Sequence, residues 1–286
     1  MPLGKGRGGA LPWDPRAEAA LGRVPFFVRP LVRRKVEERV AASGGRRVGL
    51  EDFQEAEAAF RAVSAGKSQK ELKAMLPVDN RPGVEMVVVE ACRSRLSNCP
   101  NPLIDTQKWL ERVRAWVEEL DLSERLRRRV AEDKILFHHK LKIAIAGCPN
   151  GCSRPQIADL ALVGMTRPRL VEPEACTACG ACAEACPDGA VKQDHGPPEF
   201  YRGLCQGCLA CSRACPVGGI ELDPPGVRVL MAGKLGRHPH LARPVMETHD
   251  PAEVFSYWTR ELEEYLASAP SGRRFSAWWL ERHPAD

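Results

Sequence analysis

Apolar residues recur at helical spacing near both ends of this 286-residue chain and form short continuous runs in its middle. The stretch after Pro30 predicts a helix that stops at Gly44-Gly45, and a second helix follows from Leu50. This second helix carries apolar residues at helical spacing: Phe53, Ala56, Phe60 and Val63. We therefore expect a helical hairpin over residues 24–67, preceded by a disordered, partly Gly-rich and basic stretch over residues 1–23.

The next part of the chain predicts a buried strand followed by two helices. A polar linker over residues 65–83 leads into an apolar run at Val84–Val89, which predicts the strand. Asp105 can cap a following helix, and a shorter basic helix is expected over Ser123–Glu132. The helix after Asp105 has an apolar stripe that we interpret as core: Trp109, Val113, Trp116, Val117 and Leu120.

Further strands and a long helix complete the pattern. The segment from His138 to Ala146 predicts a strand that runs into a tight cysteine loop, and Val227–Met231 predicts another strand. Asp250-Pro251-Ala252-Glu253 is a capping box that opens a helix. The inward residues of that helix are expected to be Val254, Trp258, Leu262 and Leu266. This mixture of helices and strands predicts an α+β fold.

Composition and charge exclude several classes of protein. Hydrophobic residues make up 44% of the chain, but no apolar run approaches the roughly eighteen residues of a membrane span. The N-terminus has no apolar signal-peptide core, so we expect the twelve cysteines to lie in a reducing, cytoplasmic compartment. The formal charge is +5, with basic clusters at positions 29–35 and 125–129. Nucleic-acid binding is one interpretation of these clusters, but no recognition motif accompanies them, and we expect solvated helix faces.

Eight of the cysteines form two copies of one spacing. The first run is Cys176, Cys179, Cys182 and Cys186, and the second is Cys205, Cys208, Cys211 and Cys215; a proline follows each run. In this spacing three thiolates hold one [4Fe-4S] cluster and the fourth crosses to the other cluster. The expected ligand sets are therefore Cys176, Cys179, Cys182 with Cys215, and Cys205, Cys208, Cys211 with Cys186. Disulfides or zinc sites are the alternative, but zinc sites rarely repeat this spacing. The stretch resembles bacterial two-cluster ferredoxins.

The remaining cysteines are Cys92, Cys99, Cys148 and Cys152. Two pairs from two loops suit a third [4Fe-4S] cluster, while buried free thiols are the alternative. The sequence segments around these cysteines resemble the cluster-binding half of siroheme sulfite and nitrite reductases. The longest of these segments is Gly147-Cys148-Pro149-Asn150-Gly151-Cys152-Ser153-Arg154. That resemblance implies that Cys152 bridges the cluster to a siroheme iron. It also implies a reductase-type domain over residues 84–170 and 222–286, with the two-cluster ferredoxin domain inserted at residues 171–221.

The same resemblance implies residues that contact siroheme and its substrate. Glycines in the segment 232–239 would let the backbone approach a flat macrocycle, whose carboxylates basic side chains would bind. The candidates for siroheme binding are Cys152, Arg154, Gly233, Lys234, Gly236 and Arg237; a plain loop is the alternative for the last four. Lys140 and Lys142 match the family's Lys-x-Lys and would bind and protonate sulfite or nitrite, although they could be ordinary surface lysines. His138 and His139 are weaker candidates.

Two departures from the reductase pattern affect the expected function. Cys92 and Cys99 have six intervening residues where the family usually has five, and the chain has room for only one of the family's two pseudo-symmetric halves. A second subunit or an oligomer must then supply the missing half. Residues 24–64 instead resemble the small helical domain of light-independent protochlorophyllide reductase, in which Arg29, Arg33 and Arg34 could bind a tetrapyrrole. Docking is the simpler role for this hairpin.

Three hypotheses follow. The first is a sulfite- or nitrite-reductase-like subunit in which electrons from a donor protein enter the ferredoxin domain and reach a siroheme through Cys152. The second is a three-cluster electron-transfer protein without siroheme that serves a separate catalytic subunit. The third is a reductase of another tetrapyrrole or an organic substrate. Direct use of NAD(P)H is not expected, since no dinucleotide-binding fingerprint is present.

Overall fold

The computed structural model describes residues 11–24, 26, 29–64, 77–94 and 98–284, with side chains of residues 59–64 left out. The chain divides into two compact units, residues 1–76 and residues 77–286. Each unit has its own hydrophobic core and is described separately.

Three helices form the N-terminal unit: α1 (Pro15–Leu21), α2 (Arg29–Ala42) and α3 (Leu50–Ser64). Helix α1 corrects the expected disorder of residues 1–23, since Asp14 caps its first turn and Ala17 is fully buried. It packs with Val36, Val40 and Val48, so the hairpin has a third helix to cover its apolar side. The predicted disorder of residues 1–10, most of the predicted linker, and the side chains of Phe60 and Val63 lie outside the described residues.

A five-stranded sheet organises the second unit, in the spatial order β11-β10-β5-β4-β2. Its strands are β2 (Val87–Ala91), β4 (Leu141–Ala146), β5 (Leu160–Met165), β10 (Gly226–Met231) and β11 (Arg243–Thr248). Strands β2, β4 and β5 run parallel, whereas β10 pairs antiparallel with both β5 and β11. The first strand starts three residues later than expected, and residues 137–139 form a 3-10 turn instead of a strand.

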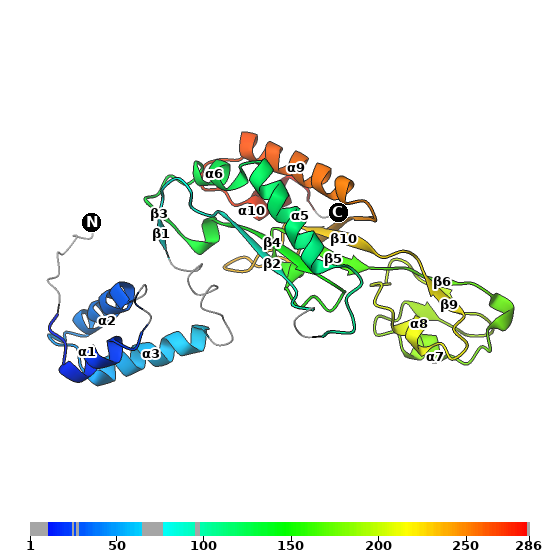
Figure 1. The fold of residues 1–286 in the computed structure, drawn as a ribbon, viewed down its shortest axis with the longest axis horizontal. Coiled ribbons are helices and arrows are strands. Elements are labelled where there is room, and N and C mark those ends of the chain that lie inside the picture. The colour runs from blue at the N-terminus through cyan, green and yellow to red at the C-terminus, as the bar shows by residue number, and fades with distance from the viewer. Residues whose placement is uncertain (1–10, 25, 27–28, 65–76, 95–97, 285–286) are drawn as a thin grey trace. The chain divides into compact units, whose positions relative to one another are not determined.

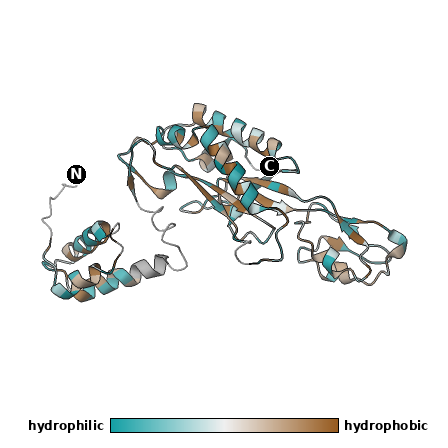
Figure 2. Ribbon diagram, in the orientation of Figure 1, coloured by the Kyte–Doolittle hydropathy of each residue, from teal (hydrophilic) through white to brown (hydrophobic). Residues whose placement is uncertain are grey.

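Four helices cover one face of this sheet: α5 (Thr106–Glu119), α6 (Leu122–Arg127), α9 (Pro251–Ser268) and α10 (Phe275–Arg282) (Figure 1). Asp105 and Asp250 cap α5 and α9 as expected. Between these helices, the rings of Trp116 and Trp258 lie 5.6 Å apart, and Trp258 is fully buried. Figure 2 shows the apolar bands that the sheet strands contribute to this core. Helix α6 ends at Arg127, before the expected Glu132.

The opposite face of the sheet carries small side chains. Strand residues that alternate with the core-facing ones point to this side. They include Ala144, Ala146, Ala161 and Val163, which pack with Ala158 and Leu230. The loop that carries Cys148 and Cys152 begins directly after β4.

Between β5 and its neighbour β10 the chain leaves the sheet and returns. The excursion starts and ends in an antiparallel pair, β6 (Pro168–Leu170) with β9 (Ile220–Leu222). It contains helices α7 (Ala181–Glu184) and α8 (Ala210–Ala214) and the strand pair β7 (Val191–Lys192) and β8 (Glu199–Phe200). A further small pair joins β1 (Val78–Asp79) to β3 (Lys134–Ile135). The α+β class is confirmed, and no helix among the described residues is long and apolar enough to cross a membrane.

Candidate iron-sulfur sites

All twelve cysteines are free thiols, and eight of them line two separate cavities in the excursion. Cys176, Cys179, Cys182 and Cys215 line the first, which encloses about 350 Å³ of space, part of it open to solvent. Cys186, Cys205, Cys208 and Cys211 line the second, of about 340 Å³. These are the two sets that the spacing predicts. We name them the 176 site and the 205 site.

The backbone explains how two short motifs enclose these cavities. In the first motif Ala178 and Gly180 have positive φ angles of 53° and 79°, on either side of Cys179. Gly207 and Leu209 repeat the pattern around Cys208, both with φ of 73°. Alternation between right- and left-handed residues bends the chain into a concave loop. Each motif therefore curls around its own cavity before a short helix carries the third cysteine.

The third cysteine of each motif is the most deeply placed. Burial raises the pKa of the Cys182 thiol and raises that of Cys211 to about 11. Such a thiol is neutral at neutral pH unless a metal binds its thiolate. No three His, Cys, Asp or Glu side chains of the described part of the chain converge on one point that would suit a single metal ion. Four cysteines spread around a cavity suit a cluster instead, in which each cysteine binds a different iron.

The last four cysteines gather at the ends of β2 and β4. Cys92 follows β2, and its Sγ accepts a hydrogen bond of 3.3 Å from the backbone N–H of Gly147. The pKa of Cys148 is raised by burial first, and the negative charges of Cys152, Cys99 and Cys92 raise it further. All four thiols are thus within electrostatic reach of one another. We name this set the 92 site.

Two glycines hold the cysteine loops against β5. A Cβ atom on Gly164 would overlap the carbonyl of Gly147, the residue before Cys148. A Cβ atom on Gly207 would overlap the carbonyl of Thr166, which directly follows β5. Only glycine permits these backbone approaches.

Lys140 and Lys142, the two candidate substrate-binding lysines, have different surroundings. Burial lowers the pKa of each, but the charged neighbour of Lys140 is Glu85. Lys142 instead has Asp159, Arg274, Glu90 and Arg154 as charged neighbours, and its Nζ lies 4.3 Å from the centre of the Phe137 ring. The structure thus brings Lys142 near Arg154, which pairs with Glu90 at 3.0 Å. It does not give the two lysines a shared charged neighbour.

In the glycine-rich segment after β10, contacts within the protein explain why one position must be glycine. Gly233 lies so close to the carbonyls of Gln156 and Ala158 that a Cβ atom would overlap both. Gly236, with φ of 123°, faces open space. Lys234 pairs with His240 through two backbone hydrogen bonds of 2.9 Å, which close the loop that carries Arg237.

Buried polar atoms beside these segments test whether a further group fits there. Among the described residues, Ser153 Oγ and His240 Nδ1 are buried and have no hydrogen-bond partner. Ser153 follows Cys152, and His240 closes the loop of Gly233 and Arg237. The side chain of Arg154 is 62% exposed and can pair with a carboxylate. The residues present therefore fit a polar, carboxylate-bearing group.

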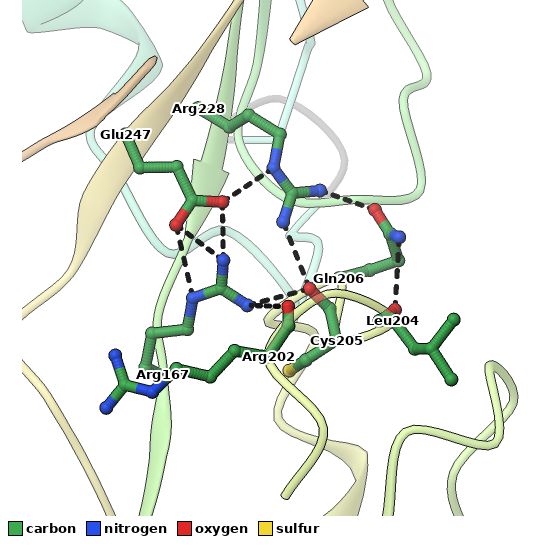
Figure 3. A network of polar contacts seen from close by, with 7 residues as sticks. All are labelled: Arg167, Arg202, Leu204, Cys205, Gln206, Arg228 and Glu247. Atoms are coloured by element: carbon green, nitrogen blue, oxygen red, sulfur yellow. Dashed lines mark hydrogen bonds and ion pairs between the residues drawn. The ribbon is translucent and has the colours of Figure 1, made fainter. Parts of the chain in front are cut away.

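Sequence reasoning missed an arginine network at the 205 site (Figure 3). Arg167 and Arg228 both donate to the carbonyl of Cys205, at 2.8 and 3.0 Å, and both pair with Glu247. Each arginine side chain is only 14% exposed. The partners lie 19 to 80 residues apart in sequence, so no local pattern signals them.

Comparison with known proteins matches two families to this chain. The family described as nitrite and sulphite reductase 4Fe-4S domain matches residues 87–283, more than half of the chain. The family described as proto-chlorophyllide reductase 57 kD subunit matches residues 13–57. The resemblances to sulfite and nitrite reductases and to protochlorophyllide reductase are confirmed.

Individual relatives match over shorter segments. The coenzyme F420-dependent sulfite reductase of Methanocaldococcus jannaschii is 38% identical over 94 residues, 33% of this chain and 13% of that protein. A subunit of the anaerobic sulfite reductase of Salmonella typhimurium is 40% identical over 70 residues, 24% of this chain and 19% of that protein. The chain thus matches less than a fifth of each relative's length. The crystal structure of dissimilatory sulfite reductase I is 16% identical with a TM-score of 0.46, over 82% of this chain and 56% of that one. By its family match, this iron-sulfur protein belongs to the nitrite and sulfite reductase 4Fe-4S domain family.

Proposed function

We propose that this chain is the iron-sulfur and siroheme-carrying subunit of an enzyme that reduces sulfite or nitrite. The observation that carries the proposal is the arrangement of twelve cysteines in three groups of four. Each group has the ligand number of a [4Fe-4S] cluster. Two groups form a ferredoxin-type insert over residues 171–221, and the third lies in the reductase-type domain of residues 84–170 and 222–286. The sulfite reductases among the relatives support this choice of activity.

When bound, the clusters supply one-electron transfer and the siroheme supplies the site of oxyanion reduction. The chain's own residues would hold these groups and the substrate. Cys152 is the most exposed thiol of the 92 site and is proposed to contact both cluster and siroheme. Arg154, Lys234 and Arg237 would pair with the siroheme carboxylates.

Lys142 would bind the substrate anion. Its side chain lies beside Arg154 on the sheet face of small residues, and partial burial strengthens its attraction for an anion. Lys140 is nearly buried beside Glu85 and is the weaker of the two candidates.

This function requires partners. The family match covers one reductase domain, so a second subunit or a second copy of the chain would complete the siroheme site. The Salmonella relative is named as a subunit, which supports a heteromer. An electron-donor protein would deliver electrons to the ferredoxin-type insert. A cytoplasmic location follows from the reduced thiols that this function requires.

A second candidate is a three-cluster electron-transfer subunit without siroheme. The observation that favours it is the separation of Lys140 from the surroundings of Lys142, which leaves only one of the two candidate lysines near the proposed siroheme face. The two candidates share the cysteine sites and differ only in siroheme and catalysis.

Anaerobic reoxidation separates the two candidates. The purified protein is reduced with dithionite, freed of excess reductant, and mixed with sulfite or with nitrite. For the reductase we expect the reduced-cluster signal to disappear with either anion, and more slowly in the Lys142→Met variant. A matched control is Lys192→Met, since Lys192 lies on β7 of the insert. Protein that stays reduced with both anions, alone and with co-purified subunits, would contradict the reductase.

A further inference from the structure

The 176 site and the 205 site differ in what surrounds them. Residues that line the 176 site run from Leu170 to Ile220, all within the insert and its β6–β9 stem. The 205 site is also lined by Thr166, which follows β5 of the central sheet. One of the two cavities therefore borders the reductase-type domain, and the lining of the other stays within the insert.

Strand β5 brings the 205 site close to the 92 site. The loop of Cys148 meets β5 at Gly164, and the loop of Cys208 meets the same chain at Thr166. Two residues of extended chain span roughly 7 Å. The backbones beside Cys148 and Cys208 are thus packed against positions two residues apart, one near the end of β5 and one directly after it.

The arginine network holds the 205 site on this strand. Arg167 donates to the carbonyls of Cys205 and Arg202, while Arg228 donates to the carbonyl of Cys205 and to the side chain of Gln206. Glu247 on the edge strand β11 binds both guanidinium groups, so it fixes the two arginines that hold the cysteine loop (Figure 3). Two cations and one anion leave a net positive charge beside the loop.

A third arginine links the insert to the loop of Cys99. Arg213 on α8 donates to Asn101 Oδ1 at 2.9 Å and to the carbonyl of Pro100 at 3.0 Å. It lies two residues after Cys211, a residue of the 205 site, and Pro100 directly follows Cys99 of the 92 site. The two sites are therefore joined on a second side.

We infer that the 205 site is the inner of the two ferredoxin-type sites, next to the 92 site, and that Arg167, Arg228 and Arg213 are positioning residues that hold it there. The 176 site is then the outer one, which faces the electron donor. This inference rests on the proposed function, since it assumes that all three sites hold clusters.

The positive charge beside the 205 site predicts the direction of electron transfer between the two ferredoxin-type clusters. A cluster gains one negative charge when reduced, and neighbouring positive charge stabilises the reduced form. The net charge of the arginine network would therefore raise the reduction potential of the inner cluster. Each transfer moves one electron, which oxidises the outer cluster and reduces the inner one. Dithionite supplies that electron in the experiment below.

The first test removes each site separately in the full chain. Iron is quantified first, and about twelve irons per wild-type chain establish three clusters. Electron paramagnetic resonance of the dithionite-reduced protein then reports magnetic coupling between neighbouring reduced clusters. In the Cys208→Ser variant, the signal of the 92-site cluster should lose its magnetic coupling to a neighbouring cluster. In the Cys179→Ser variant, the same signal should keep that coupling. The reverse pattern, with twelve irons in the wild type, would overturn the order but leave the proposed function intact; fewer irons would overturn both.

A second test keeps all cysteines, in case a cysteine variant does not fold. Arg228→Gln removes one positive charge from the arginine network, and we therefore expect the reduction potential of one cluster to fall. Arg169→Gln is the matched control, because Arg169 lies nearby on β6 and pairs with Glu221 and Asp223 instead of the Cys205 loop. Arg228→Lys should restore most of the potential. A potential unchanged in Arg228→Gln, or shifted equally in Arg169→Gln, would contradict the positioning role.

Discussion

At the residue scale, the lowered pKa of Lys142 predicts that the proposed anion binding depends on pH. The amine is charged below its pKa, and burial lowers that pKa from the ordinary 10.5. As pH rises through this lowered value the cation is lost, so affinity should fall at a lower pH than an exposed lysine would give. Nitrite is the suitable probe, since its charge is constant in alkaline solution.

The Lys142→Arg variant should keep its nitrite affinity to higher pH, because arginine stays charged. Lys142→Met should weaken binding by about tenfold or more at neutral pH. Spectroscopic titration with nitrite at several pH values measures both effects. The same alkaline loss in Lys142→Arg and in wild type would assign the titration to another group.

Gly207 gives a second prediction at this scale. Its φ of 73° and its contact with the Thr166 carbonyl both forbid a side chain. We expect Gly207→Ala to cost about 2 kcal/mol or more in unfolding free energy and to lower iron occupancy. Gly203→Ala, where a Cβ atom meets nothing within 4 Å, is the control and should behave like wild type. Equal stability of the two variants would contradict the packing described.

Some residues of the sites could be predicted from sequence and others could not. The cysteine spacing encodes which thiols share a cavity, because each motif curls locally and the fourth cysteine lies a fixed distance along the chain. The roles of Lys142 and Arg154 remain predictions. Arg167 and Arg228 carry no local signal, since their common partners, Glu247 and Cys205, come close only after the sheet has formed.

At the element scale, the helices that cover the sheet decide stability. Trp258 on α9 is fully buried against Trp116 on α5, and Trp116 Nε1 donates to Thr259 at 2.9 Å. Trp258→Ala should lower the free energy of unfolding by about 3–5 kcal/mol, because it leaves a large cavity. Tyr257→Ala, which removes a half-buried ring from the same helix, should cost less. Denaturant unfolding of the two variants checks this order, which equal losses would contradict.

N-cap residues made the starts of two helices predictable from sequence. Tertiary contacts placed other helix boundaries away from their predicted positions. Asp105 and Asp250 accept the backbone hydrogen bonds expected of an N-cap, so α5 and α9 begin where the sequence indicates. Helix α6 ends early because Arg129 donates to the carbonyls of Leu266 and Ala269 at the end of α9. A contact across about 140 residues leaves no trace in helical periodicity.

At the scale of the whole molecule, the chain divides before Pro77. The cysteines all lie after this boundary, and the core of the N-terminal unit is formed by that unit's own residues. A protein of residues 77–286 should therefore fold and keep the iron content and spectrum of the full chain. Loss of iron from this protein, with retention by the full chain, would show that the N-terminal helices are needed for cluster assembly.

The order of domains along the chain remains a prediction, which rests on the two cysteine motifs and on the segments that resemble known families. The pairing of β5 with β10 across the insert was not predicted, since some sixty residues separate the two strands. Helix α1 was missed because the surrounding glycines and prolines suggested disorder, while its burial depends on α2 and Val48.

The most direct test of the central claim is an anaerobic visible spectrum with iron and siroheme quantified per chain. We predict about twelve irons in clusters and about one siroheme, with a chlorin-type absorption band. Twelve irons without siroheme, in the full chain and in its complex with co-purified subunits, would contradict the reductase and leave the electron-transfer subunit.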